Sequence, residues 1–382
     1  MTQPPTSDEV PADAPELAEE PDAAEEPPLD PAADGAEARD GVGLCLSGGG
    51  YRAMLFHVGG LRRLNELGRL PGLTRVASVS GGSITAGVLA LAWRDLAFDD
   101  DGVGRQFTER VERPLLDLAG RTIDVPAVLT GLWPGRISRR VAAAYDRAVF
   151  HGATLQDLPG DEGPTFVLLA TNLSTGTLWR FSRTQMGDWR TSPVRSPDLR
   201  LADAVAASSA FPPFLSPPLL RVRGRTVHLT DGGVYDNLGL EPVVKTCATV
   251  LVSDGGGTFG EPKVPARDWI RATLRTLQTI DVQVRRLRRR QIVGLLASGA
   301  RAGAFWAIST DRASFSAPGG PPAPVEATTA LARTPTRLGR LPERTRHRLV
   351  NWGYVAADAA VRTWLDADAT PPEALPYPAA GV

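Results

Sequence analysis

Two glycine-rich turns combine a serine hydroxyl with backbone groups that can hold an anion. The first turn, SGGGYR, covers residues 47–52, and the second, SVSGG, covers residues 78–82. Consecutive glycines let several N–H groups point at one place, and the partial positive charge at the start of a following helix adds to their effect. A serine on a tight turn between a strand and a helix is exposed for nucleophilic attack. Together the turns predict an oxyanion hole and a nucleophile, Ser80.

Each turn also has a simpler explanation when it is taken alone. Ser80 could cap the helix that follows it, and the SGGGYR turn could bind the phosphate of a nucleotide. Against a nucleotide, the turn does not match G-x-G-x-x-G, and no Gly-Lys-Ser/Thr follows it. Arg52 could hold the loop or meet a phosphate through its planar guanidinium. In the second turn, Ser78 stands where the G-x-S-x-G elbow usually has its first glycine, which is a mild departure because serine is also small.

A serine hydroxyl needs a base that accepts its proton. One histidine follows the glycine-rich turn on the same predicted helix, but none has a convincing catalytic setting; the four are His57, His151, His228 and His347. An aspartate can serve instead when it lies within hydrogen-bond reach of the serine. TDGGVYDN offers Asp231 and SDGGG offers Asp254, each after a predicted strand. Both stay open as candidates, and so does a purely structural role, because Gly-Gly turns after strands are common.

Short apolar runs alternate with helical patterns along the chain and would position these turns. The pattern predicts strands at 42–46, 75–79, 165–170, 226–230 and 248–252. It predicts helices at 53–67 and 84–93, where apolar residues recur every three or four positions. This order indicates an α/β fold with a mostly parallel central sheet flanked by helices. Ligands of such sheets bind at the carboxyl ends of the strands, and all of the turns above fall there.

Charge is distributed unevenly along the 382 residues. Residues 1–40 contain 13 of the 43 Asp and Glu residues but one of the 42 Lys and Arg residues, so the formal net charge of −1 hides an acidic start and a basic body. The start is rich in Pro and Ala and has too few large apolar residues to offset the entropy of ordering. We therefore predict a disordered tail over residues 1–39. It could mask the basic body, bind a partner or keep the protein soluble.

Nothing in the sequence predicts secretion or a membrane-spanning helix. The first residues lack the basic start and apolar stretch of a secretory signal, and no segment reaches roughly 18 uninterrupted apolar residues. Cys45 and Cys247 both lie in apolar runs, and two cysteines in a chain of this length do not form a disulfide scaffold. We expect two buried thiols in a cytoplasmic protein.

Four motifs occur in a fixed order: SGGGYRA, SVSGG, SSAFPPF and TDGGVYDN. In this order they resemble the patatin-like phospholipases, whose fold and active site are related to those of the animal cytosolic phospholipases A2. The resemblance covers roughly residues 41–365, including ATNLSTG from Ala170 and NWGY from Asn351. It implies a patatin-like variant of the three-layer α/β-hydrolase architecture. We assign the catalytic domain to residues 40–370 and expect a flexible end at 371–382.

The resemblance also assigns roles to individual residues. It implies that Gly48, Gly49 and Gly50 form the oxyanion hole, braced by Arg52. Ser80 would be the nucleophile and Asp231 the base of a Ser-Asp dyad, since only Asp231, and not Asp254, is followed by VYDN. Ala53, where the family more often has glycine, is a second mild departure.

The activity implied is hydrolysis of phospholipid or lysophospholipid esters through an acyl-enzyme. It needs no cofactor, and calcium is not expected because no EF-hand-like acidic loop is present. The alternatives are a broader esterase or thioesterase, or a non-catalytic module that binds an anionic lipid. We expect no nucleic-acid partner, and the sequence does not indicate an oligomeric state.

Three further segments have open interpretations. Residues 269–293 form an amphipathic pattern in which Ile270, Leu274, Leu277, Ile280, Val284 and Leu287 alternate with arginines. This helix could lie on an anionic lipid surface or dock on the core with a solvated arginine face.

Residues 98–158, with Leu129, Leu132 and Trp133, could cap an acyl pocket or pack against the rest of the domain. AFPPF at 210–214 could line an acyl channel or shape a rigid loop, while Asp236 and Asn237 could orient the Asp231 loop.

Overall fold

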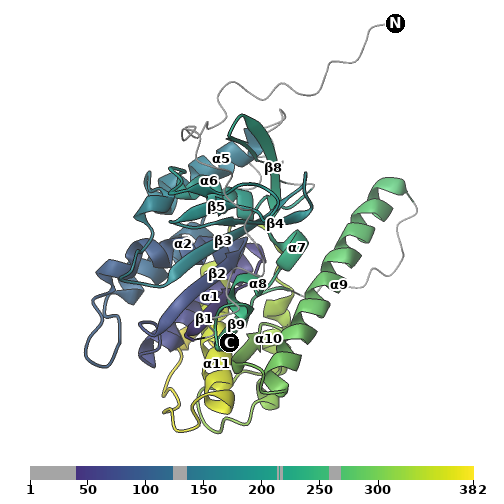
Figure 1. Ribbon diagram of the computed structural model, residues 1–382. Helices are drawn as coiled ribbons and strands as arrows, with labels where there is room; N and C mark the ends of the chain where they lie inside the picture. Colours follow the sequence, from purple (N-terminus) through teal and green to yellow (C-terminus); the bar gives the residue numbers. More distant parts are fainter. Residues whose placement is uncertain (1–39, 124–135, 213–214, 216–217, 258–267) are drawn as a thin grey trace, which may run out of the picture.

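A computed structural model describes residues 40–123, 136–212, 215, 218–257 and 268–382 (Figure 1). Within these residues, ten strands form one mixed sheet. Its central strands are parallel, and their short apolar runs fit strands that are covered on both faces. In order across the sheet they are β10 (Ala302–Ala307), β9 (Thr249–Asp254), β1 (Val42–Leu46), β2 (Leu73–Val79) and β3 (Thr165–Asn172). The predicted α/β class is confirmed.

Antiparallel strands extend the sheet beyond β3. They are β4 (Thr177–Phe181), β5 (Gln185–Gly187), β6 (Val194–Arg195) and the hairpin of β7 (Leu219–Val222) with β8 (Arg225–Asp231). One edge of β3 has two successive partners. β2 pairs with its first part, up to Val79 opposite Leu169, and β8 pairs with its last part, beginning with Asp231 opposite Ala170. Asp231 therefore lies beside β3 directly after the point where β2 ends and the chain turns away at Ser80.

Helices cover both faces of the sheet and make three layers. One face packs against α1 (Gly50–Glu66), α2 (Gly81–Ala92), α6 (Leu201–Ser208) and α11 (Glu343–Trp364). Leu44 and Leu46 of β1 point into this larger core. Cys45 points to the opposite face, where a smaller core with Cys247 lies under α8 (Glu241–Val244) and α9 (Trp269–Ala297). Both cysteines are buried free thiols, as the sequence predicts.

The remaining helices are short. They are η1 (Trp93–Leu96), η2 (Thr108–Glu112), α3 (Arg113–Ala119), α5 (Arg136–Tyr145), η3 (Asp146–Phe150), η4 (Leu155–Asp157), α7 (Gly233–Asp236), η5 (Arg312–Ser314), α10 (Val325–Ala332) and η6 (Pro378–Ala380). Those of residues 98–158 bury side chains such as Leu115, Tyr145 and Phe150 in the larger core. The described part of this region therefore packs on the domain. Leu129, Leu132 and Trp133 lie outside the described residues.

Close contact between α1 and α11 depends on glycine. A Cβ atom on Gly59 would stand 1.9 Å from the carbonyl oxygen of Val350, and one on Gly353 would stand 1.9 Å from that of Phe56. Gly59→Ala is therefore expected to lower the free energy of unfolding by at least about 3 kcal/mol, measured by denaturant unfolding. Gly60→Ala is the matched control, because its nearest neighbour is the Trp306 side chain at 3.2 Å. Equal stability of the two variants would contradict this account of the packing.

The C-terminal residues are anchored, so the prediction of a flexible end at 371–382 is replaced by an ordered one. The side-chain amide of Asn351 donates to the carbonyls of Tyr377 and Gly381, and its oxygen accepts from the Tyr377 N–H. Arg348 donates to Val382. Both anchors lie on α11, more than twenty positions before the segment they hold.

Helix α9 begins where predicted and ends at Ala297 instead of 293, and its arginines are divided between two faces, with Arg286 and Arg290 exposed. Arg285 donates to Asp281 and Arg289 to Asp254, and Arg288 lies 3.5 Å from Glu241. Arg288 and Arg289 face the body, where the carboxylates of Glu241 and Asp254 beneath the helix need partners. Trp269, Leu277, Ile280 and Leu287 are exposed instead. The side chains of Ile270 and Leu274 lie outside the description. Within the described residues, no helix combines the length and apolar character needed to cross a bilayer.

Candidate active site

Ser80 occupies a strained turn between β2 and α2. Its backbone has φ 51° and ψ −117°, a region that non-glycine residues rarely adopt. Although it stands at the N-cap position of α2, its side chain makes no capping hydrogen bond. The simpler explanation of Ser80 as a helix cap is therefore wrong. The strain points to an elbow that presents a hydroxyl at the carboxyl edge of the sheet.

The two glycine-rich turns pack backbone against backbone. A Cβ on Gly81 would lie 2.3 Å from the carbonyl oxygen of Gly50, and one on Gly82 would lie 2.3 Å from that of Leu46. The N–H of Gly82 donates to Ser47 at 3.1 Å. Only residues without side chains allow this approach, so the glycines of SVSGG bring the first turn next to Ser80.

The first turn leaves backbone donors unoccupied at the start of α1. Gly49 and Gly50 have φ 145° and 60°, which glycine adopts without strain. In the described part of the chain, no acceptor takes the N–H of either residue. The N–H of Gly48 is different, because it donates to the carbonyl oxygen of Asn237 at 3.1 Å. Of the three glycines expected to form an oxyanion hole, Gly48 is thus already engaged in this structure.

A further donor, not predicted from the sequence, is the N–H of Gly81. It is the first residue of α2 and follows the elbow serine directly. Among the described residues no acceptor takes this N–H either. The residue after the nucleophile often supplies an oxyanion donor in α/β-hydrolase elbows, which is the signal that would have identified it.

Arg52 holds the glycine loop from beneath. Its Nε donates to the carbonyl oxygen of Gly255 at 3.0 Å and its Nη1 to that of Thr334. Nη2 lies next to Gly49 and has no hydrogen-bond partner among the described residues. Burial and the charge of Arg285 lower the pKa of Arg52 to about 9, which still leaves it charged at neutral pH. This geometry supports a bracing role for the arginine.

Asp231 is the last residue of β8 and lies at the level of the sheet where β2 ends before Ser80. Only 3% of the residue is exposed, and burial raises its pKa to about 7, against the lowering effect of hydrogen bonds from the Gly233 N–H and the Ser80 side chain. The Gly233 bond is 2.7 Å long. Thr171 of β3 fixes the Asp231 carbonyl with a 3.0 Å bond. A carboxylate with a pKa near neutrality can both accept and return a proton at physiological pH.

The rival carboxylate, Asp254, is committed to an ion pair. Its Oδ2 lies 2.6 Å from Nη2 of Arg289, and its Oδ1 accepts from the N–H of Gly256. Burial favours the neutral acid, but the charges of Arg289 and Arg285 outweigh it and lower the pKa of Asp254 below its ordinary value. Asp254 is therefore a poor proton acceptor.

His57 links two strands and stays neutral. Its Nε2 donates to the carbonyl oxygen of Ser47 at 2.9 Å, so its Nδ1 accepts from the Ser253 hydroxyl at 2.8 Å. Burial lowers its pKa to about 4. The other histidines lie elsewhere: His151 lines a separate pocket, His228 is exposed on β8, and His347 stacks on Tyr377.

A buried set of serines supports the elbow. Ser208, from the SSAFPPF motif, accepts the Ser80 N–H at 2.9 Å, and its hydroxyl lies 2.8 Å from that of Ser83. The Ser83 hydroxyl also donates to Ser78 at 3.1 Å. Ser78, which stands where such elbows usually have their first glycine, is thus part of this support. The support by Ser208 was not predicted from the sequence, because it comes from a distant helix end.

Two motif residues near Asp231 have structural partners. Asp236 accepts from the N–H groups of Gly239 and Glu241 and so fixes the turn after α7. Asn237 accepts the Gly48 N–H through its carbonyl oxygen. In AFPPF, Phe211 is half-buried, whereas residues 213–214 lie outside the described residues.

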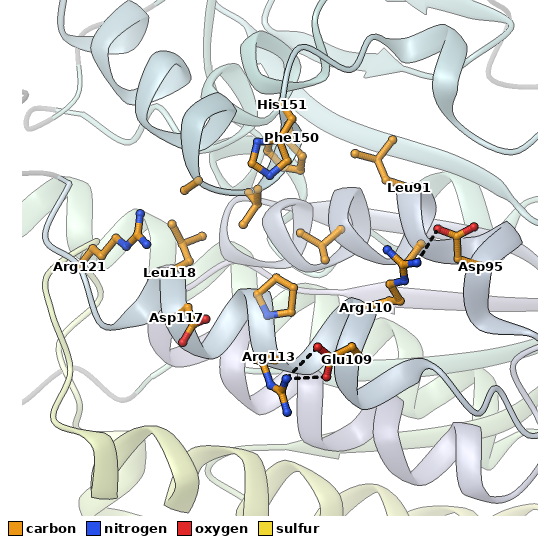
Figure 2. Close-up of a pocket in the computed structure, with 15 residues that line it drawn as sticks. Leu91, Asp95, Glu109, Arg110, Arg113, Asp117, Leu118, Arg121, Phe150 and His151 are labelled. Carbon is orange, nitrogen blue, oxygen red and sulfur yellow. Dashed lines mark hydrogen bonds and ion pairs between the residues drawn. The ribbon is translucent and has the colours of Figure 1, made fainter.

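A pocket of about 480 Å³ lies at the far end of α2, away from the elbow. Figure 2 shows its charged rim, where Arg110 pairs with Asp95 and Arg113 with Glu109. None of the candidate site residues lines it. The pocket is therefore distinct from the candidate active site.

Structural comparison places the fold with the catalytic domains of cytosolic phospholipases A2. The structure of human GIVD cytosolic phospholipase A2 in complex with a methyl gamma-linolenyl fluorophosphonate inhibitor and terbium chloride is 14% identical, with a TM-score of 0.51 over 84% of this chain and 57% of that chain. A second structure of the human protein is 11% identical, with a TM-score of 0.50 over 85% and 61%. This chain thus spans about three fifths of their length. At these identities the likeness shows the fold alone.

A sequence model of the patatin-like phospholipases matches residues 44–244, which is more than half of the chain. The protein belongs to the patatin-like phospholipase family. A sequence search of curated proteins finds no match. The matched segment contains both glycine-rich turns, SSAFPPF and TDGGVYDN, so the predicted resemblance is confirmed.

Proposed function

We propose that the protein is a serine acyl hydrolase that cleaves ester bonds of phospholipids or lysophospholipids, with Ser80 as nucleophile and Asp231 as base. The observation that carries the proposal is a strained elbow serine at the edge of the sheet where β8 ends in the buried carboxylate of Asp231, whose pKa burial raises to about 7. Membership of the patatin-like phospholipase family supports a lipid ester as substrate. The similar human protein has been solved with a fluorophosphonate inhibitor that carries a linolenyl chain, which supports the same substrate class.

The proposed reaction has two halves with one base. In the first, Ser80 Oγ attacks the ester carbonyl while Asp231 takes the hydroxyl proton. The ester C–O bond then breaks, and Asp231 gives the proton to the leaving alcohol. In the second, Asp231 takes a proton from water, and the resulting nucleophile attacks the acyl-enzyme. The fatty acid leaves as the serine oxygen recovers its proton from Asp231.

Backbone donors would stabilise the negative oxygen of each tetrahedral intermediate. Gly49 and Gly50 are the best placed of the predicted set, because the Gly48 N–H is engaged with Asn237. The Gly81 N–H joins them from the start of α2. The positive ends of α1 and α2 converge on the same place and add to the stabilisation. In the proposal Arg52 keeps this loop in position.

The proposal is tested with the full chain and mixed phospholipid vesicles in the presence of a metal chelator. We expect release of fatty acid and covalent labelling by a fluorophosphonate probe. Parallel assays measure the rates on a lysophospholipid, a soluble short-chain ester and an acyl thioester. These rates distinguish a phospholipase from a broader esterase or thioesterase. If the wild-type protein neither releases acid from any of them nor reacts with the probe, the enzyme hypothesis is wrong and a lipid-binding module becomes the better explanation.

A further inference from the structure

Helix α9 presents an apolar stripe to solvent. Trp269, Ile280 and Leu287 are 78%, 54% and 57% exposed, and we call these three residues the outer stripe. They lie eleven and seven positions apart, which places them on one face of a helix. Figure 1 shows α9 running along one side of the molecule, with its N-terminal end standing away from the body. Large side chains repeated along one exposed helix face indicate a binding surface.

The charges on the helix are sorted between its two faces. Arg286 and Arg290 are exposed and flank the outer stripe. The single acidic residue in the sequence of α9 is Asp281, which is buried and paired with Arg285. The exposed face therefore combines apolar side chains with positive charge and carries no carboxylate of the helix itself. This composition matches a helix that lies in the interface of an anionic membrane.

The inner face of α9 is joined to the candidate active site. Arg285 donates to the carbonyl oxygen of Gly257, and Arg289 pairs with Asp254 at the end of β9. Helix α7, which follows Asp231 within two residues, packs on α9 and exposes Val234. The helix that carries the outer stripe therefore packs directly on α7, the helix that follows Asp231.

We propose that the outer stripe of α9 docks on an anionic lipid surface and holds the site of Ser80 and Asp231 against the membrane that contains its ester. The identity of the ester rests on the proposed function, but the docking does not. A second copy of the chain is a poorer occupant. In a pair of α9 helices packed through the outer stripe, the exposed Arg286 and Arg290 of each copy would find no exposed carboxylate on the partner helix, because the single acidic residue of α9, Asp281, is buried.

Docking is tested by sedimentation of the full chain with vesicles of phosphatidylcholine alone or mixed with phosphatidylserine. Wild type should bind the anionic vesicles more tightly, and salt should weaken that binding. The variant Trp269→Ser/Ile280→Ser/Leu287→Ser should bind at least about tenfold more weakly. Arg286→Gln/Arg290→Gln should lose most of the preference for anionic vesicles. Trp364→Ser on α11, where the tryptophan is 64% exposed, is the matched control and should bind as wild type does.

Activity separates this proposal from the proposed function. On a soluble short-chain ester, the triple variant and wild type should have equal rates, whereas on anionic vesicles the variant should be at least about tenfold slower. If wild type binds anionic vesicles but hydrolyses neither substrate, the proposed function fails and the docking stands. Equal vesicle binding by the triple variant and wild type would overturn the docking. So would a wild-type dimer that the triple substitution dissociates, because it would assign the stripe to a second copy.

Discussion

Ser80→Ala is expected to remove hydrolysis and fluorophosphonate labelling together. The hydroxyl is the proposed nucleophile, and removal of a nucleophile lowers kcat/KM by about 10⁴-fold or more in serine hydrolases. The strained backbone at this position is set by the turn, so the variant should fold. The measurement is fatty-acid release together with probe incorporation detected by mass spectrometry.

Ser209→Ala is the matched control for this variant. Ser209 is also a buried serine of the SSAFPPF motif, but its hydroxyl donates to the Val205 carbonyl within its own helix end. It should keep both activity and labelling. Labelling of the Ser80→Ala protein to the wild-type extent would show that another residue is the nucleophile.

Asp231→Asn is expected to have the second large effect on the rate. The pH dependence of kcat/KM tests whether Asp231 is the base. The carboxylate must be deprotonated to accept the Ser80 proton, so wild-type kcat/KM should rise with pH through about 7, the pKa of Asp231. Asparagine cannot accept the proton, and the rate should fall by about 10³-fold or more. The residual rate should lose the rise near pH 7. An unchanged pH profile in the variant would refute the assignment of Asp231 as base.

The same substitution should stabilise the protein at neutral pH. Because burial raises the pKa of Asp231 from 3.8 to about 7, the folded state holds a proton that the unfolded state has already lost. This residue therefore makes unfolding easier as pH rises from about 4 to 7, by up to about 4 kcal/mol. Asp231→Asn should gain stability over wild type above pH 7, and the difference should vanish below pH 4. Denaturant unfolding at several pH values measures it.

Asp254→Asn is the control for both effects. It should keep the pH profile of activity, since Asp254 makes no contact with the elbow in the proposed mechanism. It should lower stability, because Arg289 would lose its buried partner. A loss of stability in Asp231→Asn with none in Asp254→Asn would reverse these assignments.

The candidate site could be proposed from the sequence because its parts are local patterns. The strands β1 and β2 are apolar runs that end in glycine-rich turns, and a strand, turn and helix of this kind form within one segment of chain. Asp231 could be chosen over Asp254 only from the family motif. The physical difference between them is the pairing of Asp254 with Arg289 from α9, which lies 35 positions away in the sequence. No local pattern contains that information.

Other features depended on tertiary partners and were missed for that reason. The apolar spacing of α9 left open whether the helix docks on the core or lies on a lipid surface, because it cannot show that Glu241 and Asp254 of the body pair with Arg288 and Arg289. The Pro-rich end at 371–382 looked flexible because its composition cannot show that Asn351 holds it. Strands β4 to β7 and β10 were not predicted. The antiparallel strands among them are only two to five residues long, too short for periodicity to separate from loops.

The shared edge of β3 has a consequence for the newly made chain. Ser80 and the start of α2 are synthesised about 150 residues before Asp231, and β8 must pair with β3 before the carboxylate reaches the serine. At about 5–20 residues per second, translation alone separates the two by roughly 8–30 seconds. A ribosome-bound chain would thus carry its proposed nucleophile for that interval without a base, and could not attack lipids until the sheet is nearly complete.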